Sequence, residues 1–285
     1  MIDANPKYRD SVFRAYFNEP TRLLSLCNAV LETNYNDPTK LEINTLEGIF
    51  FDRQKNDISC SIGNNFLVLV EHQTTVNNNM PFRFLSYIAE LLNNLVKNKK
   101  TLYREKLLTF PSPKFFVLYD GNKNEPLKKI MRLSDAFNGD SSSLELTATS
   151  FNINLALNSP LLNKCPYLKD YSTLVGKVKS GLINGLNRHD AIIQAVKFCI
   201  SNDIMRNYLL KHSEEVFNML ALEWSLDDAL QARFDEGIEK GRSEEREMLA
   251  IKMLRKGKSP EEIHELTDMP IPHIQELFQN ILDKQ

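Results

Sequence analysis

The sequence predicts an α/β protein in which a mixed sheet flanked by helices is followed by a helical C-terminal region. Two observations support this prediction. Over residues 1–160, helical and strand-like segments follow the order α-α-β-β-β-α-β, with a further strand after them. From residue 165 to residue 232 the apolar residues keep a helical spacing and no clear strand pattern interrupts them. A chain of 285 residues can form one large domain or two smaller ones.

Two amphipathic helices open the chain. In residues 8–17, YRDSVFRAYF, the side chains of Val12, Phe13 and Tyr16 recur at helical spacing. Residues 21–31, TRLLSLCNAVL, repeat the pattern, and the turn-forming stretch NYNDPTK then breaks it. We therefore expect a pair of helices ahead of the sheet.

Short strands and one long helix follow. The stretches KLEINTLEGIFF, DISCSI and NFLVLV are β-like, and the GNN tripeptide between the last two predicts a hairpin turn. From Phe84 to Val96 the apolar residues lie on one helical stripe. Residues 114–121, KFFVLYDG, indicate a buried strand that ends in a turn, and residues 144–157 indicate a further strand.

The C-terminal region divides into three helical parts by composition. We expect a helical extension over residues 161–232, a charged linker helix over 233–258 and two short helices over 259–285. The last part forms either a helix-turn-helix or, as is commoner, a helical hairpin that serves oligomerisation.

A capping box marks the start of the first of these short helices. Ser259 is placed to cap it, Pro260 occupies the first helical position, and Glu262 lies three residues after the cap. We expect a short helix over PEEIHELT, a break at DMPI and a second helix over PHIQELFQNIL.

Composition limits the classes of partner. The formal net charge is -2, so any nucleic acid must be bound through a local basic patch or a bound metal. The N-terminus is polar and no apolar run approaches membrane-spanning length, so we expect no membrane partner and a cytoplasmic location. The four cysteines form no CxxC pair, which predicts buried thiols rather than a zinc or redox site: Cys27, Cys60, Cys165 and Cys199.

Polar side chains end the buried run FLVLVEHQTT. Because side chains alternate along a strand, Glu71 and Gln73 share one face and His72 takes the other. Asp57 opens the preceding strand, so hairpin pairing would bring it close to Glu71. Two carboxylates with water suit Mg²⁺ or Mn²⁺, which can activate water beside a phosphate. We expect His72 to be a packed structural residue rather than a general base.

This stretch resembles the core of a known family. The sequence NDISCSIGNNFLVLVEHQTTVNNNMPFRFLSYIAELL is similar to the Rpn family, the recombination-promoting nucleases also called YhgA-like transposases. The family pattern is an aspartate that opens one strand, EHQS or EHQT at the end of the next, and MPxR before a helix; Asp57, residues 71–74 and residues 80–83 match it. The opening YRDSVFRAYF, the stretch MRLSDAF and the tail MLRKGKSPEEIHELTDMP also resemble the family, so the likeness covers nearly the whole chain.

The resemblance implies a PD-(D/E)xK nuclease, with a restriction-endonuclease-like core over residues 1–160 and Mg²⁺-dependent, or Mn²⁺-dependent, cleavage of DNA. Carried over, Asp57 and Glu71 are the metal ligands, and Asp10 on the first helix is a supporting acid. Gln73 stands where the superfamily usually has lysine, and the Rpn family shares this glutamine. A neutral amide orients water by hydrogen bonds but brings no charge, which implies modest activity.

The resemblance and the charge pattern together suggest how DNA is held. Arg83 begins the helix next to Gln73, and the cluster KNKKTLYREK follows that helix. The residues expected to contact DNA phosphates are Arg83, Lys97, Lys99, Lys100 and Arg104. A homodimer would supply the two sites that double-strand cleavage needs. The alternative is a non-catalytic module that binds DNA or protein through its C-terminal helices; a true transposase has no support from any Asp-Asp-Glu core.

Overall fold

The structure, a computed structural model, describes residues 12–43, 57–138 and 143–282, and for residues 222–236 and 280–282 it describes the backbone only. The chain forms two compact units, residues 1–221 and residues 222–285. Asp10 lies outside the described residues.

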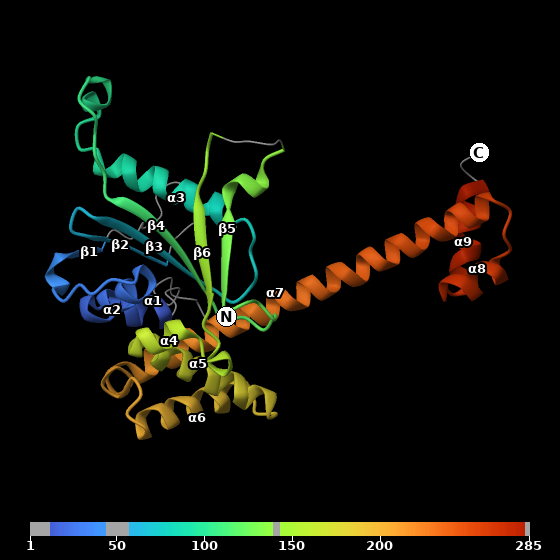
Figure 1. The fold of residues 1–285 in the computed structure, drawn as a ribbon. Helices are drawn as coiled ribbons and strands as arrows, with labels where there is room; N and C mark the ends of the chain where they lie inside the picture. The colour runs from blue at the N-terminus through green and yellow to red at the C-terminus, as the bar shows by residue number, and fades with distance from the viewer. Residues whose placement is uncertain (1–11, 44–56, 139–142, 283–285) are drawn as a thin grey trace. The chain divides into compact units, whose positions relative to one another are not determined.

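A mixed sheet organises the first unit (Figure 1). Its strand order is β1-β2-β3-β4-β6-β5. The inner strands β3, β4 and β6 run parallel, whereas β1, β2 and β5 pair antiparallel with their neighbours. The strands are β1 Leu41–Ile43, β2 Ile58–Ile62, β3 Phe66–Gln73, β4 Ser112–Tyr119, β5 Lys128–Arg132 and β6 Thr147–Asn152. The predicted α/β class with a mixed sheet flanked by helices is confirmed.

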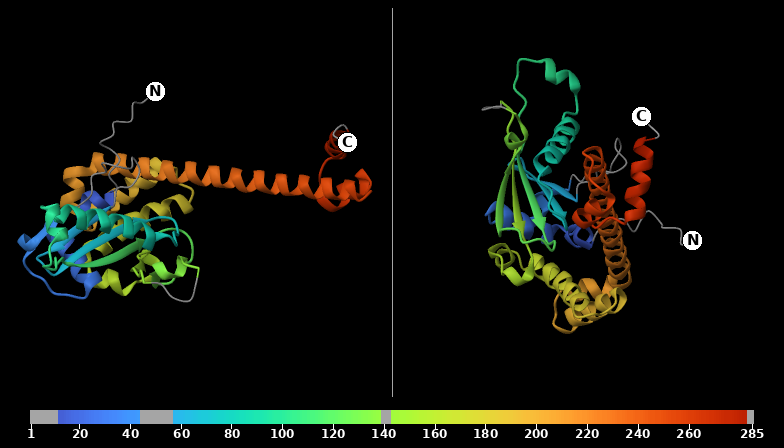
Figure 2. Two further views of the ribbon diagram at one scale, coloured as in Figure 1. Left: turned by 90° about the horizontal axis from the view of Figure 1, so that it is seen from above. Right: turned by 90° about the vertical axis from the view of Figure 1, so that its right-hand side faces the viewer.

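Helix α3, Met80–Leu95, covers one face of the sheet. It carries the crossover that the parallel pair β3 and β4 requires, and its Phe84 and Ile88 pack in one apolar cluster with Leu67 and Leu69 of β3. After α3 the chain forms the short η3, Lys99–Tyr103, which projects beyond the sheet before the chain returns to β4 (Figures 1 and 2).

The other face is covered by α1 (Val12–Phe17), α2 (Pro20–Leu31) and α5 (Pro166–Ile183). The ring of His72 on β3 stacks on Phe13 of α1 at 5.1 Å and meets Tyr171 of α5 edge-on at 5.5 Å. The alternation of side chains along β3 therefore sends Leu69 and His72 to opposite layers. All four cysteines are buried and free, as the sequence predicts.

The predicted hairpin between β2 and β3 is present. Ile58 pairs with Val70, and Ile62 pairs with Phe66 across the turn. Gly63 adopts a φ of 52°, a left-handed conformation that glycine reaches without strain. This turn fixes the register of β2 and β3. The register in turn determines which residues face each other at the end of the hairpin away from the turn.

The edge strand β5 was not expected from the sequence. Its residues are KKIMR, and among them Met131 alone is buried. A strand that presents one apolar side chain to the core gives too short an alternation to be recognised. It pairs with β6 and so widens the sheet beyond the predicted strands.

Helices fill the rest of the first unit, as predicted. They are α4 Pro160–Lys164, α5, α6 Arg188–Ser201 and the start of α7, with short 3-10 turns η2 Pro38–Lys40, η4 Leu133–Ala136 and η5 Leu155–Leu157. Helix α7 spans Arg206–Arg255, with one non-helical residue at His212. The domain boundary expected at residues 232–233 falls inside this helix. None of the helices in the described part of the chain has the length and apolar character needed to cross a bilayer.

The second unit joins the end of α7 to α8 (Pro260–Thr267) and α9 (Ile271–Leu282). The predicted capping box is present: Ser259 Oγ accepts the Glu262 N–H at 3.2 Å, and the Glu262 carboxylate accepts the Ser259 N–H at 2.9 Å. The three helices share a small core of Ala250, Leu254, Ile263, Met269 and Ile274.

Candidate functional site

Two neighbouring strand ends bring Asp57 and Glu71 together. One residue beyond the Ile58–Val70 pair, the hairpin register sets Asp57 opposite Glu71. Asp57 Oδ2 accepts the backbone N–H of His72 at 2.7 Å, which fixes this carboxylate to the end of β3. The convergence predicted from the spacing of the two acids is therefore present in the fold.

The Glu71 carboxylate is buried and has one oxygen occupied. Its Oε2 accepts a hydrogen bond from Arg83 Nη2 at 3.0 Å and lies 3.4 Å from the Gln73 amide nitrogen. Among the residues that the structure describes, its Oε1 is buried without a hydrogen-bond partner. A buried carboxylate oxygen without a partner is costly, so the position indicates a ligand.

Arg83 is itself held by a neighbour one helical turn along α3. Tyr87 Oη accepts from Arg83 Nη2 at 2.8 Å and from Nε at 3.2 Å. The guanidinium therefore lies between the Glu71 carboxylate and the Tyr87 hydroxyl, with part of its surface exposed. It is well placed to balance negative charge at this end of the sheet.

Burial raises the pKa of both carboxylates. Burial, and next the negative charge of Asp57, raise the pKa of Glu71 to about 8, although the Arg83 charge acts in the opposite direction. Burial also raises the pKa of Asp57, against the lowering effect of His72 and Arg83. Glu71 therefore retains a proton at neutral pH unless a cation replaces it.

The donor set fits a hard divalent cation. Asp57 and the unpartnered Oε1 of Glu71 supply carboxylate oxygens, which Mg²⁺ and Mn²⁺ prefer. Within the described ranges, no group of three or more histidine, cysteine or acidic side chains is arranged so that it could hold a metal ion. A site of two carboxylates suits Mg²⁺, because this ion keeps several of its waters.

Gln73 borders the same site. It follows Glu71 by two residues on β3 and shares its face of the sheet, and its side chain is partly exposed. An amide at this position can donate hydrogen bonds and accept them.

His72 lies on the opposite face, as expected. Its Nε2 is 3.2 Å from Asp120 Oδ2 and 3.3 Å from the Tyr171 hydroxyl. Lys179 also contacts Asp120, through the backbone carbonyl and at 4.0 Å through Oδ1. The buried partner Asp120 was missed by sequence reasoning, although it directly follows a strand within a strand-ending Asp-Gly pair, which is a common turn signal. Burial raises the pKa of Asp120, but the facing His72 outweighs it and holds the pKa below its usual value.

The residues predicted to contact DNA lie in two separate places in the structure. Arg83 joins the carboxylates, whereas Lys97, Lys99, Lys100 and Arg104 lie at or beyond the other end of α3. Sixteen residues of helix separate the two ends, a length of about 22 Å. Lys99 Nζ bonds back to Asn93 near the end of α3. The structure therefore does not bring the basic cluster into the carboxylate site.

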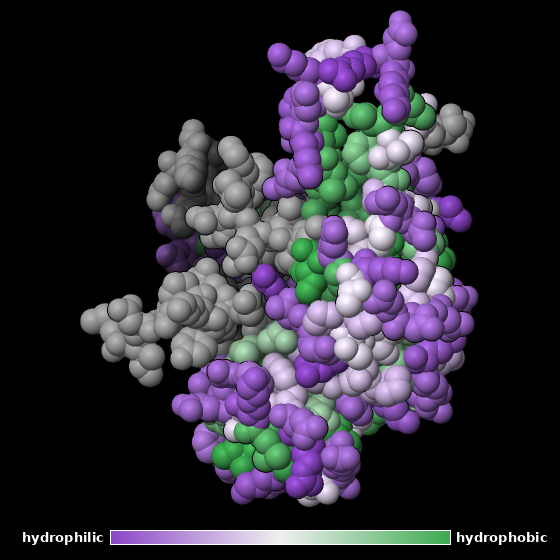
Figure 3. All heavy atoms as spheres, turned by 90° about the vertical axis from the view of Figure 1, so that its left-hand side faces the viewer, coloured by the Kyte–Doolittle hydropathy of each residue, from purple (hydrophilic) through white to green (hydrophobic). Residues whose placement is uncertain are grey.

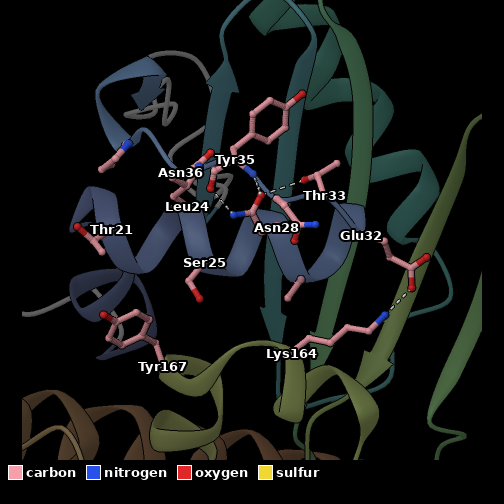
Figure 4. Close-up of a pocket in the computed structure, with 13 residues that line it drawn as sticks. Thr21, Leu24, Ser25, Asn28, Glu32, Thr33, Tyr35, Asn36, Lys164 and Tyr167 are labelled. Atoms are coloured by element: carbon pink, nitrogen blue, oxygen red, sulfur yellow. Dashed lines mark hydrogen bonds and ion pairs between the residues drawn. The ribbon is translucent and has the colours of Figure 1, made fainter.

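A separate groove of about 630 Å³ runs along α2 (Figure 4). Its polar groups are largely used to hold the loop after α2: Asn28 donates to Tyr35 O at 2.8 Å and accepts from Tyr35 N at 2.8 Å. Lys164 bridges to Glu32 at 2.7 Å, as the dashed line in the figure marks. The groove contains neither carboxylate of the site described above.

Comparisons of the chain with protein-family models, with curated proteins and with solved structures found no match.

Proposed function

We propose that the protein is a Mg²⁺-dependent DNA endonuclease of the Rpn kind, with a PD-(D/E)xK site at the ends of β2 and β3. The observation that carries the proposal is the buried Oε1 of Glu71, which lies opposite Asp57 and has no hydrogen-bond partner within residues 12–43, 57–138 and 143–282. A buried carboxylate oxygen without a hydrogen-bond partner, at the end of an apolar strand, destabilises the fold unless something binds there. The sequence resemblance names that ligand as a catalytic metal.

Asp57 and Glu71 would hold the Mg²⁺, or Mn²⁺ in its place. The bound cation would supply Lewis acidity toward a phosphodiester and toward water. Asp57 is positioned by the His72 backbone N–H, and Glu71 by Arg83, so both carboxylates are oriented before any ligand arrives.

Gln73 and Arg83 support the reaction in different ways. The Gln73 amide orients the attacking water by hydrogen bonds, without the positive charge that a lysine would bring. The Arg83 guanidinium is partly exposed and can meet the negative charge of a backbone phosphate. With a neutral amide at position 73, less charge stabilises the transition state, and the expected cleavage rate is modest.

The product of the proposed reaction, a broken DNA backbone, fits a role in recombination. Breaks in a DNA backbone create the ends from which strand exchange starts, and a homodimer would place one site on each strand. We propose the cytoplasm as the compartment in which this reaction takes place.

The test is a nicking assay on supercoiled plasmid with Mg²⁺, Mn²⁺, Ca²⁺ or EDTA. Wild type should nick with Mg²⁺ or Mn²⁺ and not with EDTA. Asp57→Asn and Glu71→Gln keep the shape of each side chain but remove its charge, so each should lower the rate by at least about 100-fold, the loss of several kcal/mol of transition-state stabilisation.

Asp135→Asn serves as the matched control, because Asp135 is an exposed carboxylate in η4 away from the site. It should nick as wild type does. Equal nicking by wild type and by folded Glu71→Gln protein, at equal purity, would rule out the proposed site.

A further inference from the structure

The segment that follows α3 exposes large apolar side chains. Leu102 is 54% exposed, Tyr103 is 90% exposed and Leu107 is 82% exposed. They lie on and just after η3, which projects beyond the sheet (Figures 1 and 2). Exposed apolar side chains that have no binding role are usually scattered singly over a protein surface. Several of them grouped on one projecting segment therefore indicate contact with a partner.

The same segment is strongly basic. Residues 96–111 carry five cationic side chains and one carboxylate, in a chain whose net charge is -2. The cations Lys97, Lys99, Lys100, Arg104 and Lys106 are all exposed. In Figure 3 this segment forms the top of the molecule, where hydrophilic side chains surround hydrophobic ones. The charge is complementary to a polyanion.

An exposed face of α3 connects this segment to the carboxylate site. Phe82, beside Arg83, is 62% exposed, and Ser86, Ala89 and Asn93 follow it on the same face at helical spacing. The face ends at Lys97, about 22 Å from Phe82 along the helix. Apart from the neighbouring Glu90, the side chains between the two ends are small and uncharged, so they offer no barrier to a phosphate backbone.

We propose that this surface binds an unpaired stretch of DNA, with Phe82 and Tyr103 as stacking platforms and the cations of residues 97–106 as phosphate contacts. The inference rests on the proposed function and adds the substrate class, which is DNA with single-stranded character. An exposed aromatic ring stacks on the face of an unpaired base, whereas bases inside a duplex have their faces covered.

A membrane surface is the competing class of partner for basic and apolar side chains. The geometry favours DNA, because the apolar residues lie on a 3-10 turn of five residues rather than on a long amphipathic helix. The exposed path also leads to the carboxylate pair, which a membrane partner would not explain.

The experiment measures binding of full-length protein to fluorescent DNA in EDTA, so that cleavage plays no part. Single-stranded, forked and fully paired oligonucleotides of one length and sequence are compared by anisotropy. Wild type should bind the single-stranded and forked DNA more tightly than the duplex. Tyr103→Ala should weaken that binding about 10-fold, the loss of one base stack, and leave duplex binding unchanged.

Two further variants separate stacking from charge. Lys100→Ala should weaken binding to every DNA and reduce the dependence of log affinity on log salt by about one. Ile183→Ala is the matched control, because Ile183 is 85% exposed but lies at the end of α5. It should bind all three DNA forms as wild type does. Since Tyr103 is almost fully exposed, its variant should melt at the wild-type temperature.

Equal affinity for single-stranded and paired DNA would overturn the inference, and so would a Tyr103→Ala variant that loses both equally. Binding of wild type, but not Tyr103→Ala, to vesicles of phosphatidylserine and phosphatidylcholine would overturn it in favour of a membrane partner. The nicking assay with Glu71→Gln is independent of these results. Selective binding without metal-dependent nicking would remove the proposed reaction alone, and nicking without selectivity would remove this inference alone.

Discussion

Glu71 is the residue on which the proposed chemistry depends. It is buried at the end of an apolar strand and faces a second acid. One of its oxygens is bonded by Arg83, and the other has no partner in the described part of the chain. Its pKa of about 8, caused first by burial and then by Asp57, means that the folded protein holds a proton that the unfolded chain would release. The energetic cost of this arrangement therefore depends on pH and, under the proposed function, on bound metal.

Glu71→Gln should stabilise the metal-free protein at neutral and alkaline pH. Below the ordinary pKa of 4.5 both folded and unfolded states are protonated, so the side chain costs nothing. As pH rises from 4.5 towards about 8 the unfolded state ionises first, and wild-type stability falls. Glutamine does not titrate, so above pH 8 the variant should be more stable by at least about 1 kcal/mol, the value of one pKa unit.

Thermal unfolding in EDTA from pH 5 to pH 9 measures this difference. The gap in Tm between variant and wild type should widen with pH, and adding Mg²⁺ should raise the Tm of wild type alone. Parallel curves at all pH values would mean that Glu71 is not held as a buried acid.

The hairpin of β2 and β3, and the parallel pairing of β3 with β4, position the site at the scale of elements. Gln73 pairs with Tyr119, and the chain leaves both strands at the same edge. Beyond them, Gly121 lies against the backbone of Thr74: a Cβ at position 121 would lie 1.9 Å from the Thr74 carbonyl oxygen. Only a residue without a side chain fits between the two strand ends.

Gly121→Ala should therefore displace the chain after Gln73. We expect a loss of about 2 kcal/mol or more in unfolding free energy, as for a side chain forced into packed backbone, together with a fall in nicking rate. Chemical denaturation and the nicking assay measure the two effects.

Gly63→Ala is the control at this scale. Gly63 also sits in a tight turn, with a φ of 52°, but a Cβ there meets no atom within 4 Å. It should cost about 1 kcal/mol for the left-handed conformation and leave the nicking rate of the folded protein unchanged. If both variants lose activity equally, the close approach at Gly121 is not what holds the site.

At the scale of the whole molecule, the two units divide the candidate functions. The carboxylate pair, Arg83 and the projecting η3 all belong to residues 1–221, whereas α8 and α9 have a core of their own in residues 222–285. The exposed faces of α8 and α9 carry Glu261, Glu265 and Glu276, which offer little attraction to a DNA backbone.

A chain ending at residue 221 should keep metal-dependent nicking within about 10-fold of wild type, because it retains the whole site. The alternative, a binding module that acts through the C-terminal helices, predicts that this truncation abolishes function. A folded fragment, checked by circular dichroism, that binds no DNA and does not nick would favour the alternative.

Much of the candidate site could be predicted from the sequence, because it depends on local rules. The alternation of side chains along a strand places Glu71 and Gln73 on one face. The GNN turn fixes the hairpin register, which sets Asp57 opposite Glu71. The capping box at Ser259 marks the start of α8. Each of these follows from residues a few positions apart, or from one turn of known geometry.

The tertiary structure decided what depends on residues far apart in the chain. The bond from Arg83 to Glu71, the contact between Asp120 and His72, and the addition of β5 to the sheet edge all arise when separate elements pack together. The same is true of the 22 Å that separates the basic cluster from the carboxylates, since a helix between two charged segments sets their distance. Sequence periodicity determines which face a side chain takes, but burial and unsatisfied hydrogen-bonding groups exist only once that face meets another.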